Sequence, residues 1–354
     1  MKKYGYIAIV IVAVGILAGC SKTEVNLPAE KEISFAVGSY ASRTKAPAGL
    51  DDVDGGISAF SSKGFLHAEG YEGQTQDFFG SSGETISWKS AGSVWTPSHP
   101  YYWPKSSESY INFVSWYDKN GAPDSPSETS VSWTFDGVGR TLATDDNLMI
   151  ADEAWRYNAN TTNALQYEGD AVLSGVPTLF HHLLAKISFR VRVSEVLSNV
   201  TITVRNFSLT GVYTTGTLAL SNSDPASGPQ TRAWTGGWSF TGETAGSVSG
   251  AASLTPGTSW QFLLGETSVL PQDIDDIRVV FSYDISTQID SNNAISETVP
   301  VSIALSDFGI VEMLMNQKIT CSITINPALQ QISIDPAEIE AWVNETEQTI
   351  VVNE

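Results

Sequence analysis

The feature that most constrains the fold of this chain is the alternation of apolar and polar residues that recurs along it. Segment 187–193 has the sequence Ile-Ser-Phe-Arg-Val-Arg-Val, and segments 200–205, 301–305 and 319–325 share its period of two. Alternate side chains project from the same face of a strand, so each segment has one apolar face and one polar face, as in antiparallel sheets. The sequence therefore predicts an all-β fold.

Turn-forming clusters separate these segments. Gly, Pro, Asn and Asp gather at residues 54–56, 120–124, 221–225 and 291–293. Many short strands with this punctuation are typical of β-sandwiches.

The amino terminus predicts export. Lys2 and Lys3 precede an apolar run at residues 7–17, which is too short to span a bilayer comfortably. The run ends in Leu17-Ala18-Gly19-Cys20 and so resembles a lipobox, which implies cleavage before Cys20 and acylation of that residue. We expect residues 1–19 to be a lipoprotein signal peptide, and acyl chains to hold the mature protein on a membrane without a transmembrane helix. No later stretch is apolar enough to span a bilayer.

Composition limits the classes of partner. The chain has 354 residues and a formal net charge of −20, and loss of the two lysines in the signal makes the mature chain more acidic. An acidic balance argues against nucleic acid as a partner, because a phosphate backbone attracts clustered Lys and Arg. Charged residues make up only 16%, so a sizeable core is expected. If Cys20 carries lipid, Cys321 is left alone, and its place in the apolar phase of 319–325 favours a buried thiol.

The length predicts two domains. We expect residues 20–32 to be a polar tether and the first strand to be Ile33–Val37, followed by a linker that contains Arg43 and Lys45. A junction near residues 176–182 divides the rest into an N-terminal domain, 33–180, and a C-terminal domain, 181–354.

Catalytic, metal and cofactor sites are not predicted. Only His181 and His182 are adjacent among the four histidines, and neighbouring side chains on a strand point to opposite faces. The acidic pairs 145–146 and 152–153 lack a Gly-punctuated calcium loop, so we interpret them as solvated loop acids. No nucleophile elbow, phosphate-binding loop or dinucleotide fingerprint is present. The sequence thus favours a non-enzymatic protein.

Aromatic residues are concentrated between residues 88 and 117. Sugar-binding surfaces use exposed aromatic faces, but large rings more often supply buried area, and we favour a core role. The members are Trp88, Trp95, Tyr101, Tyr102, Trp103, Tyr110, Phe113, Trp116 and Tyr117.

In this block the chain resembles the fimbrillin-like proteins, the subunits of Bacteroidales type V pili. Further segments agree with the family in order along the chain. The matching pieces are Trp95-Thr96-Pro97, Tyr101 to Pro104, Tyr110 to Tyr117, Asp146 to Ala151, Leu179 to Phe189, Asn316 to Ile325, Ile334 to Pro336, and Ala341-Trp342.

The resemblance implies two tandem transthyretin-like β-sandwiches and assembly by strand exchange. A lipoprotein precursor is cut after a basic residue in its first linker, for which Arg43 is the first candidate and Lys45 the second. The strand carrying Ile33, Phe35 and Val37 is then removed. Its groove is filled by the carboxy-terminal segment of a neighbouring subunit, which in this chain places Ile350, Val351 and Val352 as the donor strand.

The resemblance further implies an outer-membrane or cell-surface protein whose partners are other pilin subunits, in a homopolymer or a mixed fimbria that supports adhesion. Stalk, tip and anchor subunits share the fold, and the apolar final segment favours a stalk, which must both donate and receive a strand. The alternative interpretation is a monomeric surface lipoprotein that binds a glycan or a host protein through aromatics of its first domain.

Overall fold

The computed structural model describes residues 31–39, 57–71, 73–89, 94–159, 165–166, 172–173, 175–222 and 230–342. Within these ranges the regular structure is β, apart from a short 3-10 helix, Leu305–Phe308, so the predicted all-β fold is confirmed. The same ranges contain no helix with the length and apolarity needed to cross a membrane.

The N-terminal part is built on a sheet that closes on itself. β2 pairs with β4 through residues 59–62 and with β6 through residues 61–67, so seven strands form a ring in the order β2, β6, β8, β12, β1, β5, β4. Their bounds are β1 (Phe35–Ser39), β2 (Ala59–His67), β4 (Glu84–Lys89), β5 (Val94–Pro97), β6 (Tyr110–Asp118), β8 (Leu148–Ala151) and β12 (Val176–His182). β3 (Gln76–Asp77) pairs with β2, β9 (Glu153–Tyr157) pairs with β6, and β16 (Gln230–Arg232) pairs with β9.

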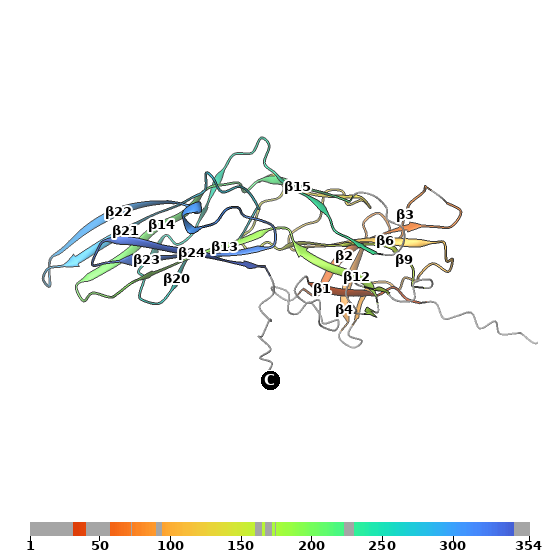
Figure 1. Cartoon of the computed structure of the whole chain (residues 1–354), viewed down its shortest axis with the longest axis horizontal. Coiled ribbons are helices and arrows are strands. Elements are labelled where there is room, and N and C mark those ends of the chain that lie inside the picture. Colours follow the sequence, from red (N-terminus) through yellow and green to blue (C-terminus); the bar gives the residue numbers. More distant parts are fainter. Residues whose placement is uncertain are drawn as a thin grey trace, which may run out of the picture. The chain divides into compact units, whose positions relative to one another are not determined.

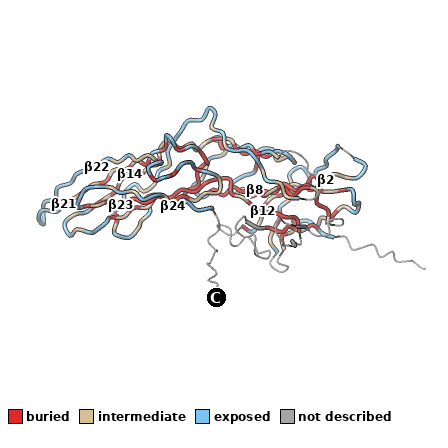
Figure 2. Tube along the Cα trace, in the orientation of Figure 1, coloured by how far each residue is buried: buried red, intermediate tan, exposed pale blue. Residues whose placement is uncertain are grey.

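The ring encloses an aromatic-rich core. Figure 2 shows the buried residues concentrated on strands such as β2, β8 and β12. The core includes Phe35, Phe60, Trp95, Phe113 and Phe180, each nearly inaccessible to solvent.

A second core lies on the outer face of the ring. It is covered by a three-stranded sheet of β7 (Ser130–Phe135), β15 (Gly216–Ser221) and β17 (Thr235–Ser239), with Trp133 and Leu218 among its buried residues. β15 and β17 lie between two strands of the C-terminal part in sequence, yet β15 pairs with β7 of the N-terminal part. The domain division after residue 180 stays a prediction. β15 follows that division in sequence but pairs with β7, which precedes it.

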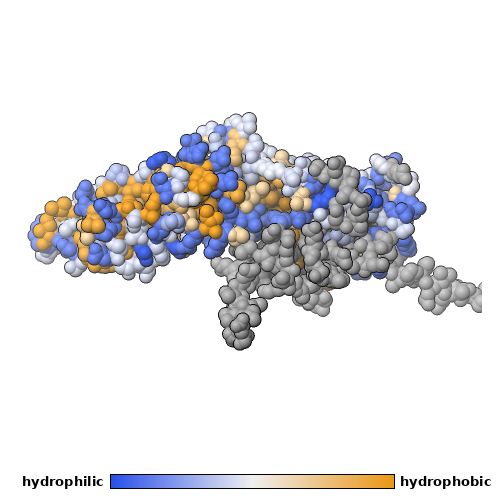
Figure 3. Space-filling model, in the orientation of Figure 1, coloured by the Kyte–Doolittle hydropathy of each residue, from blue (hydrophilic) through white to orange (hydrophobic). Residues whose placement is uncertain are grey.

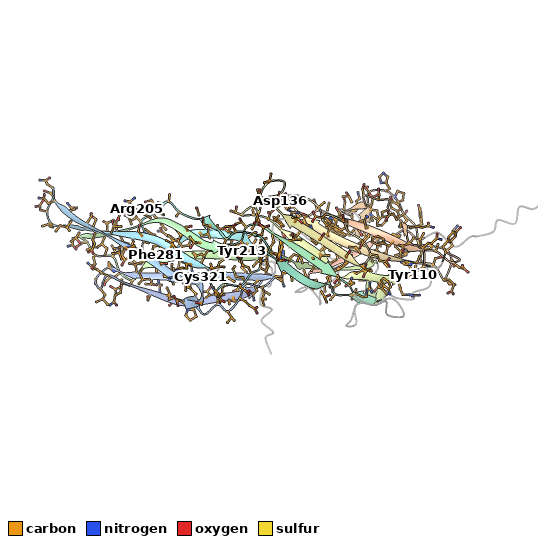
Figure 4. The ribbon with its side chains drawn as sticks, turned by 90° about the horizontal axis from the view of Figure 1, so that it is seen from above. Tyr110, Asp136, Arg205, Tyr213, Phe281 and Cys321 are labelled. Atoms are coloured by element: carbon orange, nitrogen blue, oxygen red, sulfur yellow. The ribbon has the colours of Figure 1, made fainter. Side chains whose placement is uncertain are left out.

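The C-terminal part is a sandwich of two sheets (Figure 1). One has the order β20, β13, β23, β24, with bounds Gln261–Val269, Ala185–Val193, Gln317–Asn326 and Gln331–Ala341. The other has the order β18, β14, β21, β22, with bounds Gly246–Ser249, Val200–Val212, Arg278–Gln288 and Ala294–Ala304; β19 (Ser253–Leu254) also pairs with β14. Phe281 of one sheet and Cys321 of the other, both labelled in Figure 4, belong to the shared core. β10 (Leu165–Gln166) and β11 (Val172–Leu173) form a separate two-stranded sheet.

Candidate functional site: the groove that holds strand β1

β1 is an interior strand of the N-terminal ring. Phe35–Ser39 pair in parallel with Val176–Phe180 of β12, and Phe35 pairs with Trp95 of β5 on the other side. Just before the strand, the Ile33 amide donates a hydrogen bond to the carbonyl of Tyr101 at 2.8 Å. Figure 1 shows β1 beside β12 in the N-terminal part. Removing β1 would therefore open the ring between β12 and β5.

Alternate side chains of this segment point into the core. Ile33 is 1% exposed, Phe35 2% and Val37 7%. The Phe35 ring lies edge-to-face against Phe60 and Phe113, with centroid separations of 5.7 and 5.5 Å. This geometry is the favoured one for aromatic pairs. The structure thus brings together the three residues predicted for the displaced strand.

The groove also accommodates the backbone of β1 closely. The Val176 amide donates to the Ser34 carbonyl at 2.7 Å. A Cβ added to Gly175 would lie 2.9 Å from the Ala36 nitrogen and 2.9 Å from the Phe35 carbonyl carbon. Real Cβ atoms do not approach backbone this closely, so only glycine allows β12 to begin this near to β1.

Burial makes β1 a substantial part of the stability of the ring. Each fully buried aliphatic or aromatic side chain contributes about 1.5–3 kcal/mol relative to exposure. With Ile33, Phe35 and Val37 buried together, the cost of emptying the groove is several such contributions. The groove therefore needs an occupant.

The other predicted residues of this scheme lie outside the described residues. They are the acylation residue Cys20, the processing residues Arg43 and Lys45, and the donor residues Ile350, Val351 and Val352. Their roles stay predictions.

The described chain ends at an anchored residue, Trp342. Its ring is 3% exposed and stacks on His182 at a centroid distance of 4.0 Å, with the Lys186 ammonium 4.5 Å from the ring centroid. Its amide donates to the Asn316 carbonyl at 2.7 Å. The segment that follows residue 342 is therefore attached to the body at a fixed point.

The histidines occupy hydrogen-bonded positions. His67 contacts Glu128 at 2.8 Å, His181 contacts Asp152 at 2.9 Å, and His182 contacts the Asn147 side chain at 2.9 Å. Across the described ranges no three His, Cys, Asp or Glu side chains are grouped as metal ligands. Burial raises the pKa of the Cys321 thiol, as expected for an inert core cysteine.

The interpretation of both acidic pairs as solvated loop acids is wrong for two members. Asp146 is buried and accepts hydrogen bonds from the Asn120 side chain and the Ala143 amide. Glu153 is buried on β9 against Arg232 of β16, whose guanidinium also lies 3.7 Å from the centroid of the Trp155 ring. Burial raises the pKa of Glu153 to about 7 despite Arg232. Asp146 and Glu153 are thus structural groups.

Most of the aromatic block fills cores. Trp95, Trp103, Phe113 and Trp116 are buried, and Tyr102 is the member of the block with the largest exposed fraction, 39%. The block therefore mainly builds the walls of the groove and of the second core.

Comparison with known proteins gives one family. The model of the family described as fimbrillin-like matches residues 56–342. A solved fimbrial protein from Bacteroides vulgatus is 14% identical, with 88% of this chain and 99% of that chain covered and a TM-score of 0.57, which supports a shared fold. The fimbrial anchor protein Mfa2 of Porphyromonas gingivalis is 8% identical over 89% of this chain and 99% of its own, with a TM-score of 0.32. No curated protein sequence matches the chain.

Proposed function

Since this chain belongs to the fimbrillin-like family, we propose that it is a fimbrial subunit that polymerises by exchanging β1 for a strand of a neighbouring subunit. The family consists of structural proteins of fimbriae, not enzymes, and its members assemble with other subunits at the cell surface. The proposal concerns how that assembly works in this chain.

The proposed sequence of events starts at the membrane. The precursor is acylated at Cys20 and carried to the outer membrane, and a protease cuts it after Arg43 or Lys45. The cut separates β1 from the rest of the chain. The segment containing Ile350, Val351 and Val352 of another subunit then enters the groove.

The observation that carries the proposal is that β1 is an interior strand of the ring and also the first strand that the structure describes. It completes the ring, yet residues 40–56 form its only covalent link to the strands that surround it. One cut therefore makes β1 a separate piece, and its departure would leave a groove with unpaired backbone groups on β12 and β5. Such edges are templates for a strand from another chain.

Cutting alone does not empty the groove. The buried side chains and hydrogen bonds of β1 persist after the peptide bond is broken, so the strand leaves only when a competitor replaces it. β1 runs parallel to β12, and parallel pairing is slightly less stable per residue than antiparallel pairing. A donor that enters antiparallel to β12 would gain along the five residue pairs of that ladder, and would give up the single antiparallel pair that β1 makes with β5.

Donation and reception occur at different places on one subunit, which supports a stalk role. The groove lies in the N-terminal ring, whereas the proposed donor follows Trp342. Because the two surfaces differ, each addition leaves a new groove or a new donor free. Head-to-tail contacts of this kind produce filaments when they do not close.

The test is assembly after controlled proteolysis. The purified non-lipidated precursor is treated with a trypsin-like protease and run on SDS gels without heating, beside a chain truncated after Trp342. We expect a ladder from the full chain and none from the truncated chain, which keeps every described residue. Arg43→Gln/Lys45→Gln is the control for processing, and a cut full chain that stays monomeric would reject the proposal.

A further inference from the structure

The pocket for Phe35 is the most restrictive part of the groove. Phe60 and Phe113 flank the Phe35 ring at interplanar angles of 79° and 80°. Both belong to strands of the closed ring, β2 and β6, so the pocket lies deep in the core and not at its rim.

A further set of rings holds these walls in place. Phe60 contacts Trp95 at 5.3 Å and Phe180 at 5.2 Å between ring centroids. Phe113 contacts Phe79 and Trp103, each at 5.8 Å. The cost of a smaller occupant depends on how far the walls can move inward, and walls supported from behind move little. The pocket therefore discriminates by size.

The positions on either side of Phe35 are restricted as well. Ile33 and Val37 fill aliphatic positions two residues away, and Ala36 between them is 4% exposed. Ala36 lies against the start of β12, where Gly175 allows the close approach. The groove thus fits the alternation aliphatic–aromatic–aliphatic, with a small residue after the aromatic one.

The tail of this chain matches that alternation incompletely. Its best register places Ile350 at the aromatic position, with Val352 at one aliphatic position and Gln348 at the other. This holds for both strand directions, because Ile350 is central in each. Val351 then stands beside the central residue, where a parallel donor needs a residue of the size of Ala36.

We propose that the groove selects a donor strand with a central aromatic residue from a different subunit in preference to the tail of a second copy. This inference rests on the proposed strand exchange and names its preferred partner, a fimbrial subunit whose donor strand carries aliphatic, aromatic and aliphatic residues at alternate positions. The chain's own tail is a weaker donor for the same groove.

Peptide competition on the protease-cut chain truncated after Trp342, which keeps every described residue and has no tail of its own, tests this selectivity. The probe is a fluorescent peptide with the sequence of Lys31–Ser39, and the competitors are its Phe35→Ala variant, the tail peptide 343–354, and tail peptides carrying Ile350→Phe or Ile350→Phe/Val351→Ala. We expect the Ile350→Phe tail peptide to bind at least about tenfold more tightly than the unchanged tail peptide. The Phe35→Ala peptide should bind at least about tenfold more weakly than the Lys31–Ser39 peptide.

The outcomes separate this inference from the function on which it rests. A tail peptide whose affinity Ile350→Phe lowers or leaves unchanged overturns the selectivity and leaves strand exchange intact. If no peptide enters the cut chain, both are overturned. Because only peptides are varied, a folding defect cannot account for any of these results.

Discussion

The two halves of this molecule finish their cores in different ways. The buried residues of the C-terminal sandwich core, among those that the structure describes, lie between Ala185 and Ile325, and Ile332, Ile334 and Ala337 of β24 pack against them. The core of the N-terminal ring depends on Ile33, Phe35 and Val37, which are connected to the next described strand only through residues 40–56. The C-terminal core is thus formed by one continuous region of the chain, whereas the N-terminal core includes β1, which a single cut would separate from the rest.

The exposed edges show the same contrast. β22 and β24 are end strands of their sheets, and they carry Pro300 and Pro336 together with acidic residues such as Glu297 and Glu338. Proline and charge on an edge strand oppose pairing with another chain. Apolar side chains still reach the surface of the C-terminal sandwich (Figure 3), and Ile295 of β22 is 63% exposed. β22 and β24 therefore resist pairing with another chain, whereas the proposed exchange requires the N-terminal ring to accept a strand in place of β1.

The largest expected effect separates the two cores directly. Phe35→Ala should lower the free energy of unfolding of the precursor by about 3–5 kcal/mol, because it leaves a cavity among supported rings. Phe189→Ala, at a position with 0% exposure in the C-terminal core, is the matched control with a similar cost. Urea unfolding of each variant measures both values.

After assembly the two variants should diverge. A subunit that has lost β1 no longer contains residue 35, so assembled Phe35→Ala should be as stable as the unchanged polymer. Assembled Phe189→Ala should remain destabilised. Equal destabilisation of both polymers would show that β1 stays in its groove.

Trp342→Ala should lower the free energy of unfolding by about 3 kcal/mol, because the buried ring and its contacts with His182 and Lys186 are lost. Trp342→Phe keeps an aromatic ring and should lose less. Thermal unfolding midpoints of the unchanged precursor, Trp342→Phe and Trp342→Ala should decrease in that order. An unchanged midpoint for Trp342→Ala would mean that the start of the tail is not anchored.

Gly175→Ala should cost about 1–3 kcal/mol, since the new methyl group meets the backbone of β1. The comparison is Gly237→Ala on β17, where an added Cβ has no neighbour within 4 Å, and where we expect a change below about 0.5 kcal/mol. Denaturant titration of both precursors checks the difference. A donor that occupies the same path should make Gly175→Ala slow ladder formation too.

The smallest effect concerns the buried carboxylate of Glu153 on β9. The pKa of Glu153 is raised from 4.5 to about 7, so ionisation destabilises the folded state and stability falls as pH rises between those values. Glu153→Gln should flatten this fall, which is on the order of 1–3 kcal/mol. The exposed Arg190–Glu338 pair of the C-terminal sheet offers the contrast, and Glu338→Gln should change stability by less than about 1 kcal/mol. Unfolding free energies of the two variants measured across pH 4–8 distinguish these effects. If Glu153→Gln left the fall of stability with pH unchanged, Glu153 would not be its source.

The alternation of apolar and polar residues indicates where strands lie in this chain, but it does not indicate which strands pair with each other. Segments 187–193 and 319–325 were predicted as strands, and they lie within β13 and β23, which pair in parallel. The pairing of β1 with β12, about 140 residues apart, leaves no local signal, because alternation specifies a face and not a neighbour. The crossing of β15 to β7 was missed for the same reason.

The candidate site was predictable in part. The alternation of Ile33, Phe35 and Val37 indicated a buried strand, and the structure confirms their burial. Gly175 gave no signal, since its role arises only when β1 lies beside it. The acidic pair 152–153 is interpreted as solvated loop acids because it lacks a calcium-loop pattern, whereas Glu153 begins β9. Burial of a carboxylate depends on a partner such as Arg232, which lies far away in sequence.

Mass spectrometry with hydrogen exchange on protease-assembled material tests strand exchange most directly. We predict that the fragment ending at Arg43 or Lys45 is absent from SDS-resistant oligomers, and that the amides of residues 349–352 exchange more slowly there than in the uncut precursor. Oligomers that retain the fragment in equal amount, with residues 349–352 exchanging as in the precursor, would contradict the account.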